Sequence, residues 1–422
     1  MKKWLLACFA VALVLLGGGA LLYRELKLSY RGYSNTTLIE IEPGTRAGEI
    51  AARLAERGVL AHRTPFLALY ALGRARHRSL KAGEYFFDRP LAPLDVYRKL
   101  VQGDVYLHAI VIPEGSDRFD MAEIFHREIG ADPSAFLRVT SQPSAVYDLD
   151  LQARSLEGYL FPDTYRFPRG ASPAAIAQTM LARFRRVLGA SLPAELRQSP
   201  ARLHQTLTLA SLVEKETPAP AERPMIAGVF ERRLAAGMPL QCDPTIVYAA
   251  RLDGQSAGKG PITQSQLDLA SPYNTYRRTG LPPGPICSPG AASIEAALHP
   301  APGHALYFVS NNHGGHVFAS TLAEHQRNVA RYRRELAELR RAAGDQGVAS
   351  SAPSSLSSEA TGGAAAQTGP EADVAPATHQ AHNQRARQRH PRSKKPKQKG
   401  SHPGVPGGPS TRPRRTAGDP GR

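Results

Sequence analysis

Two stretches of the chain share one order of apolar and polar positions. Each begins with alternating apolar residues typical of a short strand, passes through a Pro- and Gly-containing turn, and continues with the apolar spacing of an amphipathic helix. In the first stretch, Ile50 opens the helix stripe six residues after the turn glycine Gly44. In the second, Met121 lies six residues after Gly115. The repeat predicts two strand–turn–helix modules, over residues 36–106 and 107–153.

Strand–turn–helix units of this size resemble the LysM-like modules that bind glycan chains.

A third pattern predicts a helix over residues 203–217, LHQTLTLASLVEKET. The helix ends at Thr217 because Pro218 disfavours α geometry in the residue before it. One face of this helix carries residues spaced four, three and four apart: Leu203, Leu207, Ala210 and Glu214.

Glu214 therefore faces the interior, whereas Lys215 and Glu216 are expected to point away. A carboxylate that is half withdrawn from water has its pKa raised, so that it can hold a proton near neutrality and deliver it to a leaving oxygen. The alternative interpretation is a glutamate at a helix end that is paired with an Arg or Lys.

The segments after residue 154 are rich in aromatic residues, Pro and Gly, and alternate with further helical stripes. They include an amphipathic helix over 223–237, a hairpin around 312–315 and a closing helix over 322–339. We therefore predict an α+β protein whose mixed α+β catalytic domain spans residues 154–342.

Residues 4–23 form an uncharged run of the ~20 residues that cross a bilayer core. The pattern favours an N-terminal transmembrane helix within residues 1–30, and a cleaved signal peptide is the competing interpretation. Lys2 and Lys3 favour a cytoplasmic N-terminus. In either case the rest of the chain is expected outside the cytoplasm.

The net charge of +17 would suggest a nucleic-acid partner if it belonged to the folded part. Residues 343–422 are rich in Gly, Ala, Ser and Pro, and roughly a dozen Lys and Arg after His382, against the single acid Asp419, account for much of the excess. Such a segment cannot bury enough apolar surface to fold, so we predict a disordered basic tail. No nucleic-acid partner is expected, and cell-wall or membrane anions fit the tail better.

Three polar segments are candidates for a carbohydrate groove, because aromatic rings stack on pyranose faces and amides bind hydroxyl and acetamido groups. One is a stiff turn over 281–285, a candidate groove wall, and each segment could equally stabilise its own loop. The other two, 241–245 and 271–276, supply the candidate side chains Gln241, Asp243, Tyr273, Asn274 and Tyr276.

Other chemistries find little support in the sequence. His313 and His316 have ligand-like spacing, but they occupy a tight turn without a third ligand nearby. We therefore expect neither a metal nor another cofactor.

Five blocks, in this order, resemble the endolytic murein transglycosylases of the YceG-like (MltG) family, over residues ~1 to 340. The blocks are LEGYLFPDTY (156–165), LASLVEKET (209–217), QCDPT (241–245), SPYNTY (271–276) and GLPPGP (280–285). The resemblance implies a membrane-anchored enzyme that cuts the MurNAc–GlcNAc bond within nascent peptidoglycan strands. It leaves 1,6-anhydroMurNAc ends and terminates strand elongation. Cys242 stands where the family usually has Ser or Thr, and the basic tail belongs to no part of the family pattern.

In this resemblance the catalytic glutamate corresponds to Glu214. A lytic transglycosylase needs a single carboxyl group, because the muramic C6 hydroxyl and not water attacks C1. Glu157, Asp163 and Asp243 are candidates for a second acid, and we expect supporting roles for them because each lies beside Pro or Gly in a turn. The first block adds Tyr159 and Tyr165 as substrate-binding candidates.

The resemblance also implies the partners and the location. These are peptidoglycan strands, the inner membrane through the N-terminal helix, a periplasmic catalytic domain and, as a further candidate, cell-wall synthases. A non-catalytic peptidoglycan-binding scaffold is the alternative function. An unpaired, half-buried Glu214 argues against a pure binder.

Cys242 and Cys287 are expected to lie close together, because each sits beside a block assigned to the groove. A disulfide between them and a pair of buried free thiols are both compatible with the sequence.

Overall fold

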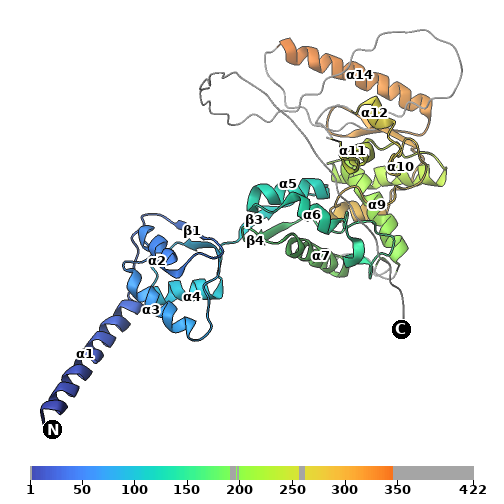
Figure 1. Cartoon of the computed structure of the whole chain (residues 1–422). Coiled ribbons are helices and arrows are strands. Elements are labelled where there is room, and N and C mark those ends of the chain that lie inside the picture. Colours follow the sequence, from blue (N-terminus) through green and yellow to red (C-terminus); the bar gives the residue numbers. More distant parts are fainter. Residues whose placement is uncertain (1, 191–195, 197–198, 256–261, 346–422) are drawn as a thin grey trace, which may run out of the picture. The chain divides into compact units, whose positions relative to one another are not determined.

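The computed structural model describes residues 2–190, 196, 199–255 and 262–345. The elements before residue 108 are α1 (Lys2–Lys27), β1 (Thr37–Ile41), α2 (Ala47–Glu56), α3 (Arg63–Arg74), β2 (Gly83–Phe87) and α4 (Pro93–Gln102). β1 pairs with β2 in an antiparallel register that sets Ile39 opposite Tyr85. Ile39, Leu54, Phe66 and Leu100 lie in a small core of their own between this ribbon and the helices (Figure 1).

The larger core begins with β3 (His108–Val111), α5 (Arg118–Ile129) and α6 (Pro133–Thr140), and continues with β4 (Thr164–Phe167) and α7 (Pro173–Ala190). β3 pairs with β4 in an antiparallel register. The second predicted module therefore takes its partner strand from residues that the sequence assigned to the catalytic domain. Both repeat glycines adopt the left-handed conformation that their turns require, with φ of 85° at Gly44 and 77° at Gly115. The helices that the sequence predicts after these two glycines are present as α2 and α5.

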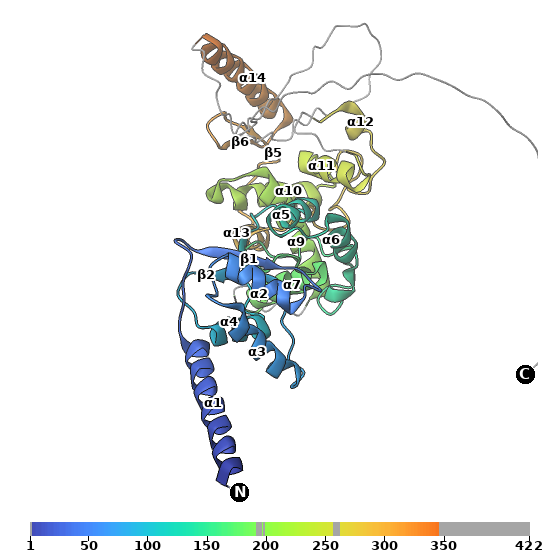
Figure 2. The same ribbon diagram turned by 60° about the vertical axis from the view of Figure 1, so that its left-hand side comes forward.

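The last part of the larger core surrounds α9 (Pro200–Glu216). It comprises α10 (Arg223–Ala235), α11 (Asp243–Leu252), α12 (Gln264–Leu267), α13 (Ala291–Leu298), the β5 (Tyr307–Ser310) and β6 (His316–Ala319) hairpin, and α14 (Leu322–Asp345). α10, α11 and α13 all contact α9, and Figure 2 shows α10 and α13 beside it. The predicted hairpin and closing helix are confirmed.

The mixed α+β class is confirmed, although each of the described sheets has two strands. Where the sequence predicts an anchor the chain forms α1, but none of the helices in the described part combines the length and apolar character needed to cross a membrane. Residues 346–422, which hold nearly all of the predicted basic tail, lie outside the described residues.

Candidate active site

Glu214 lies in the last turn of α9, which ends at Thr217, as predicted. Leu203, Leu207 and Ala210 are buried on the predicted stripe, and the Glu214 side chain is 6% exposed. Its carboxylate accepts two hydrogen bonds, from Arg223 Nη2 to Oε1 (3.2 Å) and from the Gly290 backbone N–H to Oε2 (2.9 Å). Glu214 is thus oriented toward the interior but is paired, which is the alternative that the sequence left open.

Arg223 also links Glu214 to a second carboxylate. Its Nη2 lies 3.8 Å from Oε2 of Glu114, whose side chain is half exposed. Arg223 Nε has no hydrogen-bond partner within the described part of the chain. A guanidinium with one hydrogen bond to Glu214 and a longer contact to Glu114 fixes where the Glu214 carboxyl group points.

Backbone hydrogen bonds join the turn before α5 to the segment that carries Gly290. Gly115 N–H donates to the Ser288 carbonyl, and Ser288 N–H donates to the Ser116 carbonyl, each at 2.9 Å. Gly290 leaves room for the Glu114 carboxylate, and Gly115 lies in contact distance of Glu214. A Cβ on Gly290 would lie 2.0 Å from Oε1 of Glu114, and one on Gly115 would lie 3.5 Å from Cγ of Glu214.

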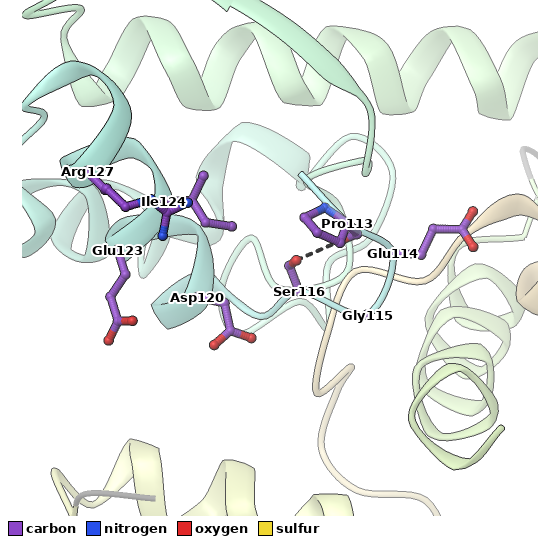
Figure 3. Close-up of a pocket in the computed structure, with 8 residues that line it drawn as sticks. All are labelled: Pro113, Glu114, Gly115, Ser116, Asp120, Glu123, Ile124 and Arg127. Carbon is purple, nitrogen blue, oxygen red and sulfur yellow. Dashed lines mark hydrogen bonds between the residues drawn. The ribbon is translucent and has the colours of Figure 1, made fainter. Parts of the chain in front are cut away.

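A pocket of about 370 Å³ opens at this turn (Figure 3). Ser116 Oγ donates to the Pro113 carbonyl and closes the turn. The carboxylates of Asp120 and Glu123 extend to the same side of the pocket (Figure 3). The lining residues are Pro113, Glu114, Gly115, Ser116, Asp120, Glu123, Ile124 and Arg127. Because Glu114 and Gly115 also border Glu214, the pocket adjoins the candidate acid.

Asp117 and Asp120 share Arg251 at the start of α5. Arg251 Nη1 lies 2.5 Å from Asp117 Oδ2 and 2.7 Å from Asp120 Oδ1. Burial raises the pKa of Asp117, the neighbouring Asp120 charge adds to this, and Arg251 opposes both. The Asp117 carboxylate also caps α5 by accepting the N–H groups of residues 119 and 120.

Glu157 forms a buried ion pair with Arg118, and 2% of its surface is exposed. Its Oε2 accepts the Arg118 backbone N–H (3.1 Å) and lies 3.5 Å from Arg118 Nε. Burial raises the pKa of Glu157 to about 7, while Arg118 lowers it. The prediction that Glu157 has a supporting role agrees with this enclosed position.

The prediction that Glu216 points away from the core is wrong. Glu216 is 3% exposed, and neither of its oxygens accepts a normal hydrogen bond from the residues that the structure describes. The nearby Arg233 donates to the carbonyls of Leu306 and Leu240 instead. Burial raises the pKa of Glu216 to about 8, although contact with the Cys242 thiol lowers it. Helices contact α9 from several sides, so the side of its last turn that carries Glu216 is covered, whereas Lys215 is exposed as predicted.

Three predicted substrate-binding residues of the first block serve the fold. Tyr159 is fully buried and donates its hydroxyl hydrogen to Asp150. Tyr165 is also buried and donates to the Phe161 carbonyl. Asp163 is about one-third exposed and pairs with Arg183 at 2.5 Å. The aromatic pattern did not distinguish core tyrosines from groove tyrosines, because both occur in Pro- and Gly-rich segments.

The other two predicted segments meet each other. Gln241 N–H donates to the Thr275 carbonyl (3.1 Å), and Tyr276 donates its hydroxyl hydrogen to Asp243. Asn274 is fully buried and its amide donates to the carbonyls of residues 267 and 269, so it stabilises its own loop. Tyr273 is 8% exposed and contacts the Tyr248 ring, with centroids 5.1 Å apart.

The cysteines are free, so the disulfide interpretation is wrong and the buried-thiol alternative holds. Cys242 lies against Glu216, and burial raises its pKa. The Cys287 thiol donates to the Ser211 carbonyl (3.3 Å). Each thiol packs against a different turn of α9. No group of three potential metal ligands gathers within the described ranges.

Sequence reasoning missed Arg223, Gly290 and Glu114. Arg223 opens a predicted helix that was described only by its apolar stripe, and Gly290 ends a segment considered only for its cysteine. Glu114 sits in the Pro-Glu-Gly turn of the second repeat, where it was interpreted as part of the turn alone. The available signal was that a carboxylate, Glu114, directly precedes the turn glycine, Gly115.

Comparisons with known proteins agree on one family. The family described as YceG-like matches residues 39–331. A Bacillus subtilis (strain 168) protein named endolytic murein transglycosylase is 32% identical over 334 residues, covering 75% of this chain and 90% of that protein. A Streptococcus pneumoniae protein of the same name is 31% identical over 323 residues, covering 70% of this chain and 58% of the relative. The crystal structure of a YceG-like protein from Listeria monocytogenes aligns with 31% identity and a TM-score of 0.47, over 70% of this chain and 99% of that one.

The buried acid Glu216, two residues after Glu214, leads to a prediction for the pH dependence of stability. The pKa of Glu216 is about 8 in the folded protein against its ordinary 4.5. The stability that accompanies its neutral form is therefore fully present below pH 4.5 and is lost as the pH rises through about 8. We expect Glu216→Gln, which stays neutral, to lose less stability than wild type between pH 5 and 9, by on the order of a few kcal/mol.

Thermal unfolding midpoints over this pH range measure the effect. Glu128→Gln, at an exposed position on α5, is the matched control and should follow wild type. Parallel pH profiles for wild type and Glu216→Gln would contradict the assignment.

Proposed function

The chain belongs to the YceG-like family, and on this premise we propose that it is an endolytic murein transglycosylase with Glu214 as its catalytic acid and base. The observation that carries the proposal is the geometry of Glu214. Its carboxyl group is nearly buried and is oriented by Arg223 and the Gly290 N–H. Its side chain lies next to Gly115, which lines an open pocket. The names of the relatives supply the substrate, murein, and the position of cleavage within the strand.

The proposed reaction has two proton transfers through one side chain. The Glu214 carboxylic acid protonates the glycosidic oxygen as the bond between that oxygen and C1 of MurNAc breaks. The resulting carboxylate then removes the proton from the C6 hydroxyl, whose oxygen forms the new bond to C1. The leaving strand keeps the first proton and Glu214 regains one, so the reaction consumes no water.

Arg223 and Gly290 have a positioning role in this scheme. The two donors occupy one lone pair on each carboxylate oxygen, which leaves the remaining lone pairs for the substrate. A carboxyl group that must meet first the glycosidic oxygen and then the C6 hydroxyl needs a fixed orientation, and hydrogen bonds from two different elements provide it.

The other carboxylates suit supporting roles. Glu157 is enclosed by Arg118, Asp163 pairs with Arg183, and Asp243 accepts from Tyr276. Glu114 is the carboxylate that shares Arg223 with Glu214. In a hydrolase it would be the candidate to position water, which makes the chemistry of the products informative.

We further propose that the reaction takes place outside the cytoplasm, because murein lies there. The uncharged run over residues 4–23 supports this location from the sequence alone. Protease added to intact spheroplasts should digest the chain at residues beyond 30. Protection of the whole chain until lysis would refute this location.

Glu214→Gln should lower kcat for murein cleavage by ~10²–10⁴-fold, because an amide cannot transfer the proton. Glutamine is similar in size and its oxygen can still accept one of the two hydrogen bonds, so the unfolding midpoint should change little. Release of soluble fragments from purified murein measures the rate. Glu231→Gln, at an exposed position on α10, is the control. A Glu214→Gln rate within threefold of wild type would refute the assignment.

The products should carry 1,6-anhydroMurNAc ends and no oxygen from solvent. The proposed attack comes from the C6 hydroxyl, so cleavage in water enriched in oxygen-18 should leave the mass of the new ends unchanged. Mass spectrometry of the fragments measures this. Incorporation of one labelled oxygen per cut would identify a hydrolase, and Glu114 would then be the candidate for a second catalytic carboxylate.

A further inference from the structure

A second pocket, of about 720 Å³, lies beside the first turns of α9 and takes no part in the proton transfers proposed for Glu214. One part of its lining is polar and the other is apolar. The polar residues are Gln152, Arg154, His204 and Gln205, and the apolar residues are Leu234, Leu281, Pro282 and Pro283. The Leu281–Pro283 turn predicted to be a groove wall therefore does line a pocket.

His204 is held in one orientation at this pocket. Its Nδ1 lies 2.6 Å from Oδ2 of Asp150, a fully buried carboxylate that also accepts the Tyr159 hydroxyl hydrogen. Burial raises the pKa of Asp150, but the hydrogen bonds from His204 and Tyr159 outweigh burial and lower it. An ionised Asp150 accepts only, so Nδ1 carries a hydrogen and Nε2 is the free end of the ring. No other residue in the described ranges hydrogen-bonds Nε2.

Arg154 supplies a positive charge at the same pocket. Its side chain is exposed, and no carboxylate in the described part of the chain forms an ion pair with it. A guanidinium presents a planar fork of N–H donors that matches a carboxylate. The amides of Gln152 and Gln205 add donors and acceptors, and Leu281 with its two prolines offers an apolar surface for small alkyl groups.

The pocket is close to Tyr273, one of the residues predicted to bind substrate. A Cβ built on Gly284 would lie 3.8 Å from Cε1 of His204 and 3.5 Å from the Tyr273 hydroxyl. Gly284 thus lies between the two side chains. His204 also belongs to the same helix as Glu214, ten residues before it.

We propose that this pocket binds the carboxylate-bearing peptide that branches from the murein strand, next to the site where the strand is cut. The exposed Arg154 guanidinium, which pairs with no carboxylate among the described residues, the free Nε2 end of His204, two amides and an apolar wall match a short peptide with free carboxylates and methyl side chains. The assignment rests on the proposed function for the identity of the ligand, but peptide binding itself does not require cleavage.

Calorimetric titration of the full chain tests the binding step. The probe is the synthetic peptide L-Ala-γ-D-Glu-L-Lys-D-Ala, compared with the same peptide amidated at both carboxylates. Wild type should bind the carboxylate form at least about tenfold more tightly than the diamide. Arg154→Gln should lose about tenfold in affinity for the carboxylate form, which corresponds to ~1.4 kcal/mol.

Two further variants separate a site from general charge effects. His204→Asn keeps an amide donor near the position of Nδ1 for Asp150 and removes the end that faces the ligand, so it should also weaken binding of the carboxylate form. Arg166→Gln, at an exposed position on β4 that lines neither pocket, should bind like wild type. Equal affinities for the peptide and its diamide, or an equal loss in Arg166→Gln, would overturn the proposal.

Cleavage kinetics distinguish this proposal from the proposed function. On strands that carry peptides, Arg154→Gln should raise KM about tenfold with kcat unchanged, and on strands stripped of peptides by an amidase it should match wild type. An equal rise in KM on both substrates would place the glycan, not the peptide, in this pocket and overturn the proposal. Absence of cleavage by wild type would count against the proposed function, and the calorimetric titration would then decide by itself whether the pocket binds the peptide.

Discussion

The segment that ends at Gly290 hydrogen-bonds to two elements that are far apart in the sequence, and the position of Glu214 depends on both. Ile286 N–H donates to Ser211 Oγ at 3.0 Å and Gly290 N–H donates to Glu214, so one side of the segment follows α9. Its other side exchanges backbone hydrogen bonds with the turn before α5 through Ser288. Glycine at 290 leaves room for the Glu114 side chain, because a Cβ there would collide with the Glu114 carboxylate, and glycine at 115 permits the left-handed backbone of the turn. The carboxyl group is therefore fixed by backbone groups rather than by flexible side chains alone.

This arrangement buries ionisable side chains, which disfavours their charged forms. Glu157 and Glu216 are both nearly inaccessible, and burial raises the pKa of the first to about 7 and of the second to about 8. Glu157 pairs with Arg118, whereas Glu216 contacts the Cys242 thiol, and the more distant Arg233 lowers its pKa too little to offset burial. A buried carboxyl group without a partner is stable only in its neutral form. Its presence two residues from Glu214 means that the last turn of α9 carries two acids in quite different surroundings.

The sequence allowed α9, its end at Thr217 and the inward position of Glu214 to be predicted, because periodicity and proline act locally. It did not allow the burial of Glu216 to be predicted, because a helical stripe identifies one buried face and cannot show that other elements cover the remaining faces. Arg223 and Gly290 were missed for a related reason: each reaches Glu214 through tertiary packing, which leaves no trace in local spacing. The burial of Tyr159 and Tyr165 could not be predicted either, since aromatic residues near Pro and Gly suit a groove and a core equally well. The cysteines were expected close to each other; both lie against α9 but on different turns, and they form no bond.

α9 carries residues of both the second pocket and the candidate active site. His204 and Glu214 are ten residues apart on one helix, which corresponds to roughly 15 Å of rise along its axis. A helix packed on several sides cannot bend easily, so the distance between a peptide held at His204 and a bond cut at Glu214 would be nearly constant. A fixed distance would couple the choice of glycosidic bond to the place where a peptide branches from the strand. Under the proposed arrangement, the cutting position would be selected by the same helix that carries the proposed catalytic carboxyl group, and no conformational change would be required.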